Sequence, residues 1–370
     1  MQPPKEKKFF WYINPANSNR YLIHNGATCL EVVQISALGI NDANLGKIPL
    51  RTGQRRDARL VSRLRGRFLL AVNQHGAAFY LNPLNGLRQA LPNAEQCLAV
   101  LQRFTAPITA KDLGLIPMNR RQIVFDPMFS GATSAKIVTG KFITGVRADQ
   151  IMPIASLSKL MTALVLLDQN IDWENEITMT ADDLDYPKAL VDPGDVTSEV
   201  PFAAGDTVTV RDLWRAMLVA SSNQAAGLLA RHSGLDQATF TAAMNRKTRE
   251  LGMQKTRFIE PSGLDPFNVS TAMEMAKIAA AAFRYPEIAA TSVMGEFTIT
   301  AKLPDGSTRK ITVVNRNYSL LQFNVSGAKT GFLHEAQRTV AAKKGETVAV
   351  VLHARSMQER NRILAELLPP

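Results

Sequence analysis

The chain has 370 residues, too many for one ordinary core, and its 46% hydrophobic and 20% charged content excludes a fibrous or disordered protein. The net charge of +11 suits a polyanionic partner, but no zinc-finger spacing or other nucleic-acid motif accompanies it, so we expect no nucleic-acid partner. No apolar run reaches the length of a membrane span, and no transmembrane segment is predicted.

An internal repeat with an offset of 68 residues fills the first third of the chain. The segment WYINPANSNRY from Trp11 aligns with FYLNPLNGLRQ from Phe79. The matching pairs are Asn14 and Asn82, Pro15 and Pro83, Arg20 and Arg88, Cys29 and Cys97, Leu45 and Leu113, and Ile48 and Ile116. Each copy is predicted to form an aromatic strand, an Asn-Pro turn, a short strand and an amphipathic stretch that stops at an Ile-Pro pair. The sequence therefore predicts two small α+β repeats, residues 1–50 and 66–118, joined by a basic linker over 51–65.

The two copies differ at their start and agree in their cysteines. The second copy has a leading strand over residues 66–72 whose equivalent would precede Met1, so we expect the first repeat to be truncated. Cys29 and Cys97 are interpreted as equivalent core positions in the two copies, not as a bridge. They lack CxxC spacing, and the histidines form no HExxH motif, so no metal site and no cofactor are predicted.

From residue 119 to residue 370 the pattern changes to one long α+β domain. Strands are predicted at 121–126, 141–146 and 348–354. Helices are predicted from Ser156 onward, over 211–232, over 236–251 and at the end of the chain.

The first of three short motifs in this domain is Ser156-Leu157-Ser158-Lys159. Because Ser156 opens an apolar helix, backbone N–H groups at the helix start would stabilise negative charge that develops beside it. Lys159 follows three residues later and shares the same helix face. A buried lysine loses its proton readily, so a neutral Lys159 is predicted to be the base that activates Ser156 as a nucleophile. An N-cap serine followed by a surface lysine is the alternative interpretation.

The second and third motifs are Ser221-Ser222-Asn223 and Lys329-Thr330-Gly331. Ser221 lies at a break between two helical stretches and is predicted to relay a proton to a leaving amine, while Asn223 would hold a substrate amide. The third motif is predicted on an edge strand, where Gly331 lets a substrate backbone approach closely. Lys329 and Thr330 could there bind a carboxylate. Helix capping and a solvated lysine are the structural alternatives.

Residues from about 121 to 367 resemble the low-molecular-mass penicillin-binding proteins, the family of serine D-alanyl-D-alanine carboxypeptidases and endopeptidases. The segments that carry the resemblance are PIASLSKLMTALV, SSNQAAGLLA, LGMQKTRFIEPSGLDPFNVST and NRNYSLL before GAKTGF. The resemblance implies a β-lactamase/DD-peptidase-like domain, with helices on both sides of an antiparallel sheet and a helical subdomain. It implies Ser156 as nucleophile, Lys159 as base, the backbone N–H groups of Ser156 and Phe332 as oxyanion hole, and Arg316 as a contact for the substrate carboxylate.

By the same resemblance, the expected activity is that of a D-Ala-D-Ala carboxypeptidase on peptidoglycan stem peptides, with β-lactam antibiotics as covalent inhibitors. An extracytoplasmic location in the cell envelope or periplasm is implied. The basic N-terminal repeats are expected to contact a wall polymer.

Three alternatives stay open. Leu333 replaces a hydroxyl residue that often follows the third motif, which leaves room for an endopeptidase that cuts peptidoglycan cross-links. A serine β-lactamase would need a second base, for which Glu260 is the candidate. A catalytically silent wall-binding or penicillin-sensing protein would keep the motifs without hydrolysing peptide.

Overall fold

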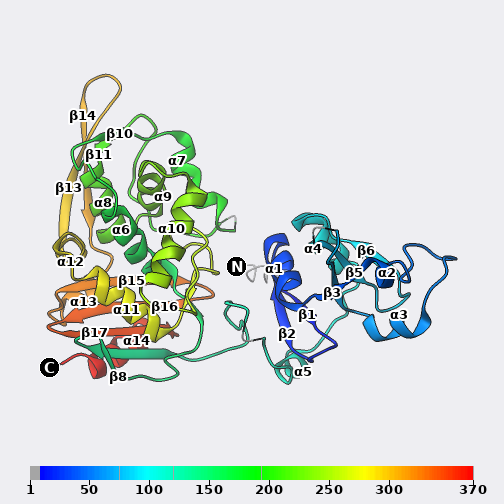
Figure 1. Cartoon of the computed structure of the whole chain (residues 1–370). Coiled ribbons are helices and arrows are strands. Elements are labelled where there is room, and N and C mark those ends of the chain that lie inside the picture. The colour runs from blue at the N-terminus through cyan, green and yellow to red at the C-terminus, as the bar shows by residue number, and fades with distance from the viewer. Residues whose placement is uncertain (1–8, 75, 120, 193, 370) are drawn as a thin grey trace. The chain divides into compact units, whose positions relative to one another are not determined.

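The computed structural model describes residues 9–74, 76–119, 121–192 and 194–369, and the chain divides into two compact units, residues 1–122 and 123–370 (Figure 1). Within the described ranges, every helix is too short or too polar to cross a membrane. The expected truncation of the first repeat concerns the start of the chain and lies outside the described residues.

The N-terminal unit combines two small sheets with short helices. Its strands are β1 (Phe10–Ile13), β2 (Arg20–Ile23), β3 (Leu38–Ile40), β4 (Phe68–Ala71), β5 (Ala77–Leu81) and β6 (Arg88–Ala90). Its helices are α1 (Gly26–Ser36), α2 (Asp42–Leu45), α3 (Ala58–Leu64), α4 (Ala94–Gln102) and α5 (Ala110–Gly114). Strands β1 and β2 pair antiparallel, and the second sheet has the order β3-β4-β5-β6. The predicted linker contains a packed helix, because Leu60, Val61 and Leu64 of α3 are buried.

The interpretation of the two cysteines is wrong in one respect. Helices α1 and α4 begin after Asn25 and Asn93, each of whose side chains accepts a hydrogen bond from the N–H three residues later, and the two helices pack against each other. Cys29 and Cys97 are both buried, as expected of core positions, but they also form a disulfide with a Cα–Cα distance of 6.0 Å. Packing of α1 on α4 brings the two equivalent positions within bonding reach, which sequence alone does not reveal.

The second unit is built on a five-stranded antiparallel sheet of order β15-β16-β17-β7-β8. Its strands are β7 (Thr133–Val138), β8 (Lys141–Thr144), β15 (Gly327–Leu333), β16 (Gln337–Lys344) and β17 (Thr347–Ala354). In β17, Val348 and Val350 pack into the core that includes α11 (Ala272–Ala282), whereas Ala349 and Val351 pack with α14 (Met357–Leu367). Because successive strand residues point to opposite faces, helices cover both sides of the sheet, as predicted.

Most other helices belong to a helical part that continues the main core (Figure 1). They are α6 (Ser158–Leu167), α7 (Ala181–Asp185), α8 (Val210–Val219), α9 (Asn223–Arg231), α10 (Gln237–Glu250) and α12 (Pro286–Ser292), whereas Leu320 of α13 (Tyr318–Leu321) packs in the cluster with α14. A smaller sheet of order β10-β11-β13-β14 joins them, formed by Glu176–Thr178, Thr207–Thr209, Glu296–Lys302 and Thr308–Val314. Residues 121–126, predicted as a strand, form turn and irregular backbone instead.

Candidate active site

Ser156 lies in a short 3-10 turn, η1 (Ala155–Leu157), and α6 begins two residues later than the sequence predicted. Ala155 has a left-handed backbone with φ of 49°, an uncommon conformation for alanine. This turn directs the chain into α6 and leaves Ser156 partly accessible, while the next residues are buried. Backbone strain of this kind is often found at functional sites.

Lys159 is fully buried on the first turn of α6 and contacts Ser156 directly. Its Nζ donates hydrogen bonds to Ser156 Oγ at 3.0 Å and to Asn223 Oδ1 and the Ser262 carbonyl, both at 2.7 Å. Burial lowers the pKa of Lys159 to about 8, although the negative charges of Glu260 and Glu199 act in the opposite direction. The site therefore holds a lysine that is partly neutral near physiological pH, within reach of a serine hydroxyl.

The second motif forms the turn between α8 and α9. Ser221 has a left-handed φ of 61°, and Ser222 caps α9 by accepting a hydrogen bond from the Ala225 N–H. Asn223 is the first residue of α9, and its side chain points back to Lys159. The motif therefore contains the capping serine of the alternative interpretation together with a side chain that contacts Lys159.

The third motif lies on β15, which is an edge strand as predicted. Lys329 is fully buried, and its Nζ donates to Ser221 Oγ at 2.7 Å and to the Thr330 carbonyl at 2.9 Å. Burial, and then the charge of Lys159, hold the pKa of Lys329 well below its usual value. The Thr330 Oγ1 and N–H both donate to Asn317 Oδ1, at 2.7 and 2.8 Å, which fixes the strand against α13.

Two glycines allow other segments to lie directly against the nucleophile turn. A Cβ at Gly331 would stand 2.9 Å from the Ser156 backbone nitrogen, and a Cβ at Gly263 would stand 2.0 Å from the Ala155 carbonyl oxygen. Gly263 also has a left-handed φ of 87°. The three motifs and the loop around Gly263 thus converge on Ser156, because only glycine leaves room for this approach.

Two of the predicted site residues lie at the surface. Phe332 is 44% exposed, and the guanidinium of Arg338 lies over its ring at 4.1 Å. Arg316 is exposed, and its backbone N–H donates to the Val219 carbonyl at the end of α8. The structure therefore brings together the lysines, serines, Asn223 and Thr330, and places Phe332 and Arg316 on exposed segments.

Several polar residues that contact these groups lie outside the three sequence motifs. Glu199 accepts hydrogen bonds from Asn223, and the fully buried Asn317 holds Thr330. The carboxylate of Glu260, considered as a β-lactamase base, accepts hydrogen bonds from Tyr186 Oη, Ser262 and the Gly263 N–H. A carboxylate with its lone pairs engaged in this way is poorly placed to activate water.

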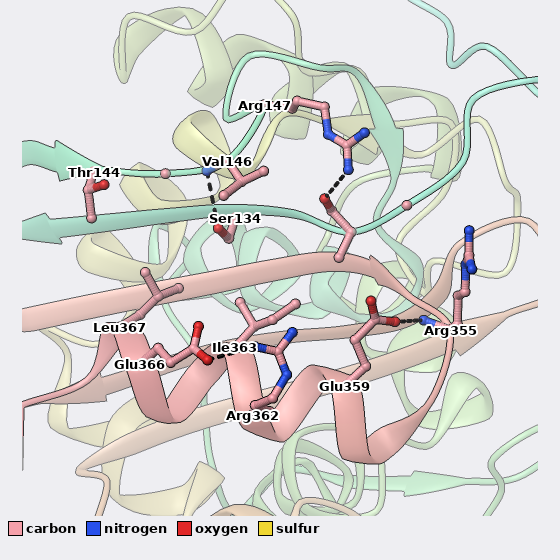
Figure 2. A pocket seen from close by; sticks show the side chains of 13 residues that line it. Ser134, Thr144, Val146, Arg147, Arg355, Glu359, Arg362, Ile363, Glu366 and Leu367 are labelled. Atoms are coloured by element: carbon pink, nitrogen blue, oxygen red, sulfur yellow. Dashed lines mark hydrogen bonds and ion pairs between the residues drawn. The ribbon is translucent and has the colours of Figure 1, made fainter.

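A separate cavity of about 440 Å³ lies between the β7–β8 edge and α14 (Figure 2). Arg147 and Arg355 border it, and Arg362 bonds to Glu366 on α14. Its lining, over the part of the chain that the structure describes, includes none of the three motifs. The three motifs that meet at Ser156 therefore lie apart from this cavity.

Comparisons with known proteins identify the family of the second unit. Residues 132–356 match the model of peptidase family S11, described as D-alanyl-D-alanine carboxypeptidase. The chain is 33% identical over 228 residues to a D-alanyl-D-alanine endopeptidase of Escherichia coli, covering 59% of this chain and 70% of that protein. It is 32% identical to a D-alanyl-D-alanine endopeptidase of Pseudomonas aeruginosa, covering 54% of this chain and 61% of that protein. It is 30% identical to the D-alanyl-D-alanine carboxypeptidase DacF of Bacillus subtilis, covering 62% and 58% of the two chains.

The fold has solved counterparts as well. A mutant of a Streptomyces DD-transpeptidase superposes with a TM-score of 0.59 at 26% identity, covering 64% of this chain and 95% of that one. The superposed share is close in size to the second unit, residues 123–370.

Proposed function

The chain belongs to the D-alanyl-D-alanine carboxypeptidase family, peptidase family S11, and from this premise we propose that it removes the terminal D-alanine of peptidoglycan stem peptides through an acyl-enzyme on Ser156. Membership makes it a serine D-Ala-D-Ala peptidase of the penicillin-binding class. The observation that supports the assignment of the nucleophile is the 3.0 Å contact between Nζ of the buried Lys159 and Oγ of the partly accessible Ser156. This chain spans between 58% and 70% of the length of the relatives named above. The substrate of the whole protein is therefore part of the proposal.

In the proposed first step, neutral Lys159 takes the Ser156 proton while Oγ attacks the carbonyl of the penultimate D-alanine. The backbone N–H groups of Ser156 and Phe332 stabilise the oxyanion. Ser221 gives its proton to the departing D-alanine amine and regains one from Lys329, to which it is hydrogen-bonded. The proton that Lys159 took from Ser156 restores Lys329, which leaves Lys159 neutral again. Water then attacks the ester, Lys159 accepts its proton and delivers it to Ser156 Oγ, and the acid product leaves.

Substrate binding uses the third motif and the exposed rim. Lys329, Thr330 and Arg316 are proposed to face the terminal carboxylate, and Asn223 to contact the peptide amide. Gly331 allows the peptide backbone to lie along β15, whose outer edge has no neighbouring strand in the described sheet.

A D,D-endopeptidase is the second candidate. Leu333 offers no hydroxyl beside the third motif, and two of the relatives named above are endopeptidases. In a cross-linked peptide, the residue beyond the scissile bond carries a side chain that must fit beside Phe332 and Leu333, which are partly or largely exposed.

An extracytoplasmic location is supported by the disulfide between Cys29 and Cys97, because disulfides persist in oxidising compartments. The family assignment points to the cell envelope in the same way. The domain division into repeats at 1–50 and 66–118, followed by the peptidase domain, belongs to this proposal.

The N-terminal repeats are proposed to contact an anionic wall polymer. Residues 1–119 hold 15 of the 43 basic residues and 6 of the 32 acidic ones, which places +9 of the net +11 charge in this segment. Arg51, Arg55, Arg59 and Arg63 are exposed, and guanidinium groups pair well with phosphate or carboxylate. Binding to isolated wall polymer that weakens with salt and with Arg59→Glu/Arg63→Glu supports the contact, and equal binding of that variant contradicts it.

The experiment that tests the activity is labelling with a fluorescent penicillin, with Ser156→Ala as control. A stable label on Ser156 is expected, and a pentapeptide offered beside a cross-linked dimer then separates carboxypeptidase from endopeptidase. Rapid loss of antibiotic without label would indicate a β-lactamase. An unlabelled protein with intact antibiotic would indicate a silent binding protein.

A further inference from the structure

Glu199 lies in the loop before β11, and its carboxylate faces the first turn of α9. Its Oε2 accepts hydrogen bonds from the backbone N–H groups of Asn223 at 3.1 Å and Gln224 at 3.0 Å. Ser222 accepts from the next N–H of the helix, that of Ala225, at 3.1 Å. The N–H groups at the start of α9, which have no partner within the helix, therefore donate to Ser222 and Glu199, and a negative charge at a helix start is stabilising.

The second oxygen of Glu199 fixes the side-chain amide of Asn223. Asn223 Nδ2 donates to Glu199 Oε1 at 2.8 Å, and Asn223 Oδ1 accepts from Lys159 Nζ at 2.7 Å. A carboxylate can only accept, so it requires the Nδ2 side of the amide to face Glu199. The Oδ1 side must then face Lys159.

The amide orientation determines where Lys159 can place its lone pair. A neutral amine has two N–H donors and one lone pair, and Asn223 Oδ1 and the Ser262 carbonyl are both acceptors at 2.7 Å. When both N–H groups donate to these oxygens, the lone pair is left for the remaining neighbour, the Ser156 hydroxyl at 3.0 Å. This is the arrangement that a general base requires.

We propose that Glu199 is a positioning residue for acylation: it holds the Asn223 amide in the orientation that keeps the Lys159 lone pair directed at Ser156. The inference rests on the proposed function, since it assigns Lys159 as the base. Glu199 is half-buried and lies outside the three motifs. A reversed Asn223 amide would present an N–H to Lys159, and the lone pair would then accept from Asn223 in competition with Ser156.

Charge gives the proposal a second readout. Lys159 is surrounded by Glu199, by Glu260 in the loop that holds Gly263, and by Lys329 on β15. The negative charge of Glu199 stabilises the protonated lysine. Its removal is expected to lower the pKa of Lys159 further, so the pH at which acylation reaches half its plateau moves to lower pH.

The test is Glu199→Gln, a variant of equal size in which the new amide can accept a reversed Asn223. Penicillin acylation is followed from pH 5.5 to 9.5 in the full chain. We expect a plateau about 10- to 100-fold lower, the range typical of lost orienting contacts, together with a midpoint at lower pH. In an Asn223→Ala background the same change should have little further effect on the plateau, because the two residues act as one unit.

Asp236→Ala is the matched control, because Asp236 is an acidic cap that accepts from the Thr239 N–H at the start of α10. It should alter thermal stability without moving the pH midpoint. A Glu199→Gln profile that matches wild type, or one that falls without any shift of the midpoint, would overturn the positioning role. Failure of wild type itself to acylate would instead overturn the proposed function.

Discussion

Lys329 Nζ lies 2.7 Å from Ser221 Oγ, and both residues are buried. This contact ties the edge strand β15 to the turn between α8 and α9, across a sequence separation of 108 residues. Ser221 holds a left-handed φ of 61° at that turn, a conformation that costs a non-glycine residue about 1 kcal/mol or more. A strained serine that faces a buried lysine indicates a local structure kept for chemistry rather than for stability.

Lys329→Met tests whether the contact between Lys329 and Ser221 serves the reaction rather than stability. The methionine has a similar length and removes the cost of burying a polar amino group, so the midpoint of thermal unfolding is expected to stay level or rise. Acylation by penicillin is expected to fall about 100-fold or more, because a proton donor to Ser221 and a cation for the carboxylate are both lost. Calorimetry and stopped-flow acylation measure the two effects. A variant that unfolds earlier and acylates normally would reverse the interpretation.

The pH dependence of acylation follows from Lys159. The pKa of Lys159 is lowered to about 8 by burial, and only the neutral amine can take the Ser156 proton. Below that pKa the neutral fraction rises about tenfold per pH unit, and above it the fraction levels off. The acylation rate constant should therefore increase with pH up to about 8 and then reach a plateau. A rate independent of pH from 6 to 9 would exclude Lys159 as the base.

The sequence predicts the contact between Ser156 and Lys159 because the two residues belong to one short local motif. Ser156 and Lys159 are one helical turn apart, and their contact needs no knowledge of the fold. Glu199 lies in an irregular loop 24 residues before Asn223, and no periodicity or spacing connects the two. Such supporting residues can be identified only from the three-dimensional structure.

The difference between local pattern and tertiary contact also explains two wrong predictions of secondary structure. Residues 121–126 have strand-like composition but pair with no strand of the described sheets, so propensity alone misled the prediction. The basic composition of 51–65 indicated a linker, yet Leu60, Val61 and Leu64 have the spacing of a buried helix face. The many charged residues on the exposed side of α3 led to the prediction of a linker instead of a helix.

Gly263→Ala tests how closely the Gly263 loop supports the nucleophile. Alanine there would carry both the cost of a left-handed φ of 87° and a Cβ only 2.0 Å from the Ala155 carbonyl oxygen. Gly252→Ala is the matched control, since Gly252 has φ of 65° but nothing within 4 Å of its Cβ position. We expect about 1 kcal/mol of destabilisation for the control and more than about 2 kcal/mol for Gly263→Ala, with acylation lost only in the latter. Denaturant unfolding measures the destabilisation and penicillin labelling measures the acylation. Equal stability and labelling of the two variants would show that the backbone at Ala155 can move to accommodate the added Cβ.

The disulfide between Cys29 and Cys97 should stabilise the N-terminal unit without affecting the peptidase domain. It closes a loop with a sequence separation of 68, for which the chain-entropy relation gives about 4 kcal/mol. Because the chain divides into two compact units, this free energy should be lost from the unfolding of residues 1–122 alone. Calorimetry with and without reductant should therefore show one transition that moves to lower temperature, while Ser156 keeps its penicillin label. The double variant Cys29→Ser/Cys97→Ser should unfold at the same temperature as the reduced protein, and reductant should not change that temperature. A loss of labelling on reduction would mean that the two units depend on each other for stability.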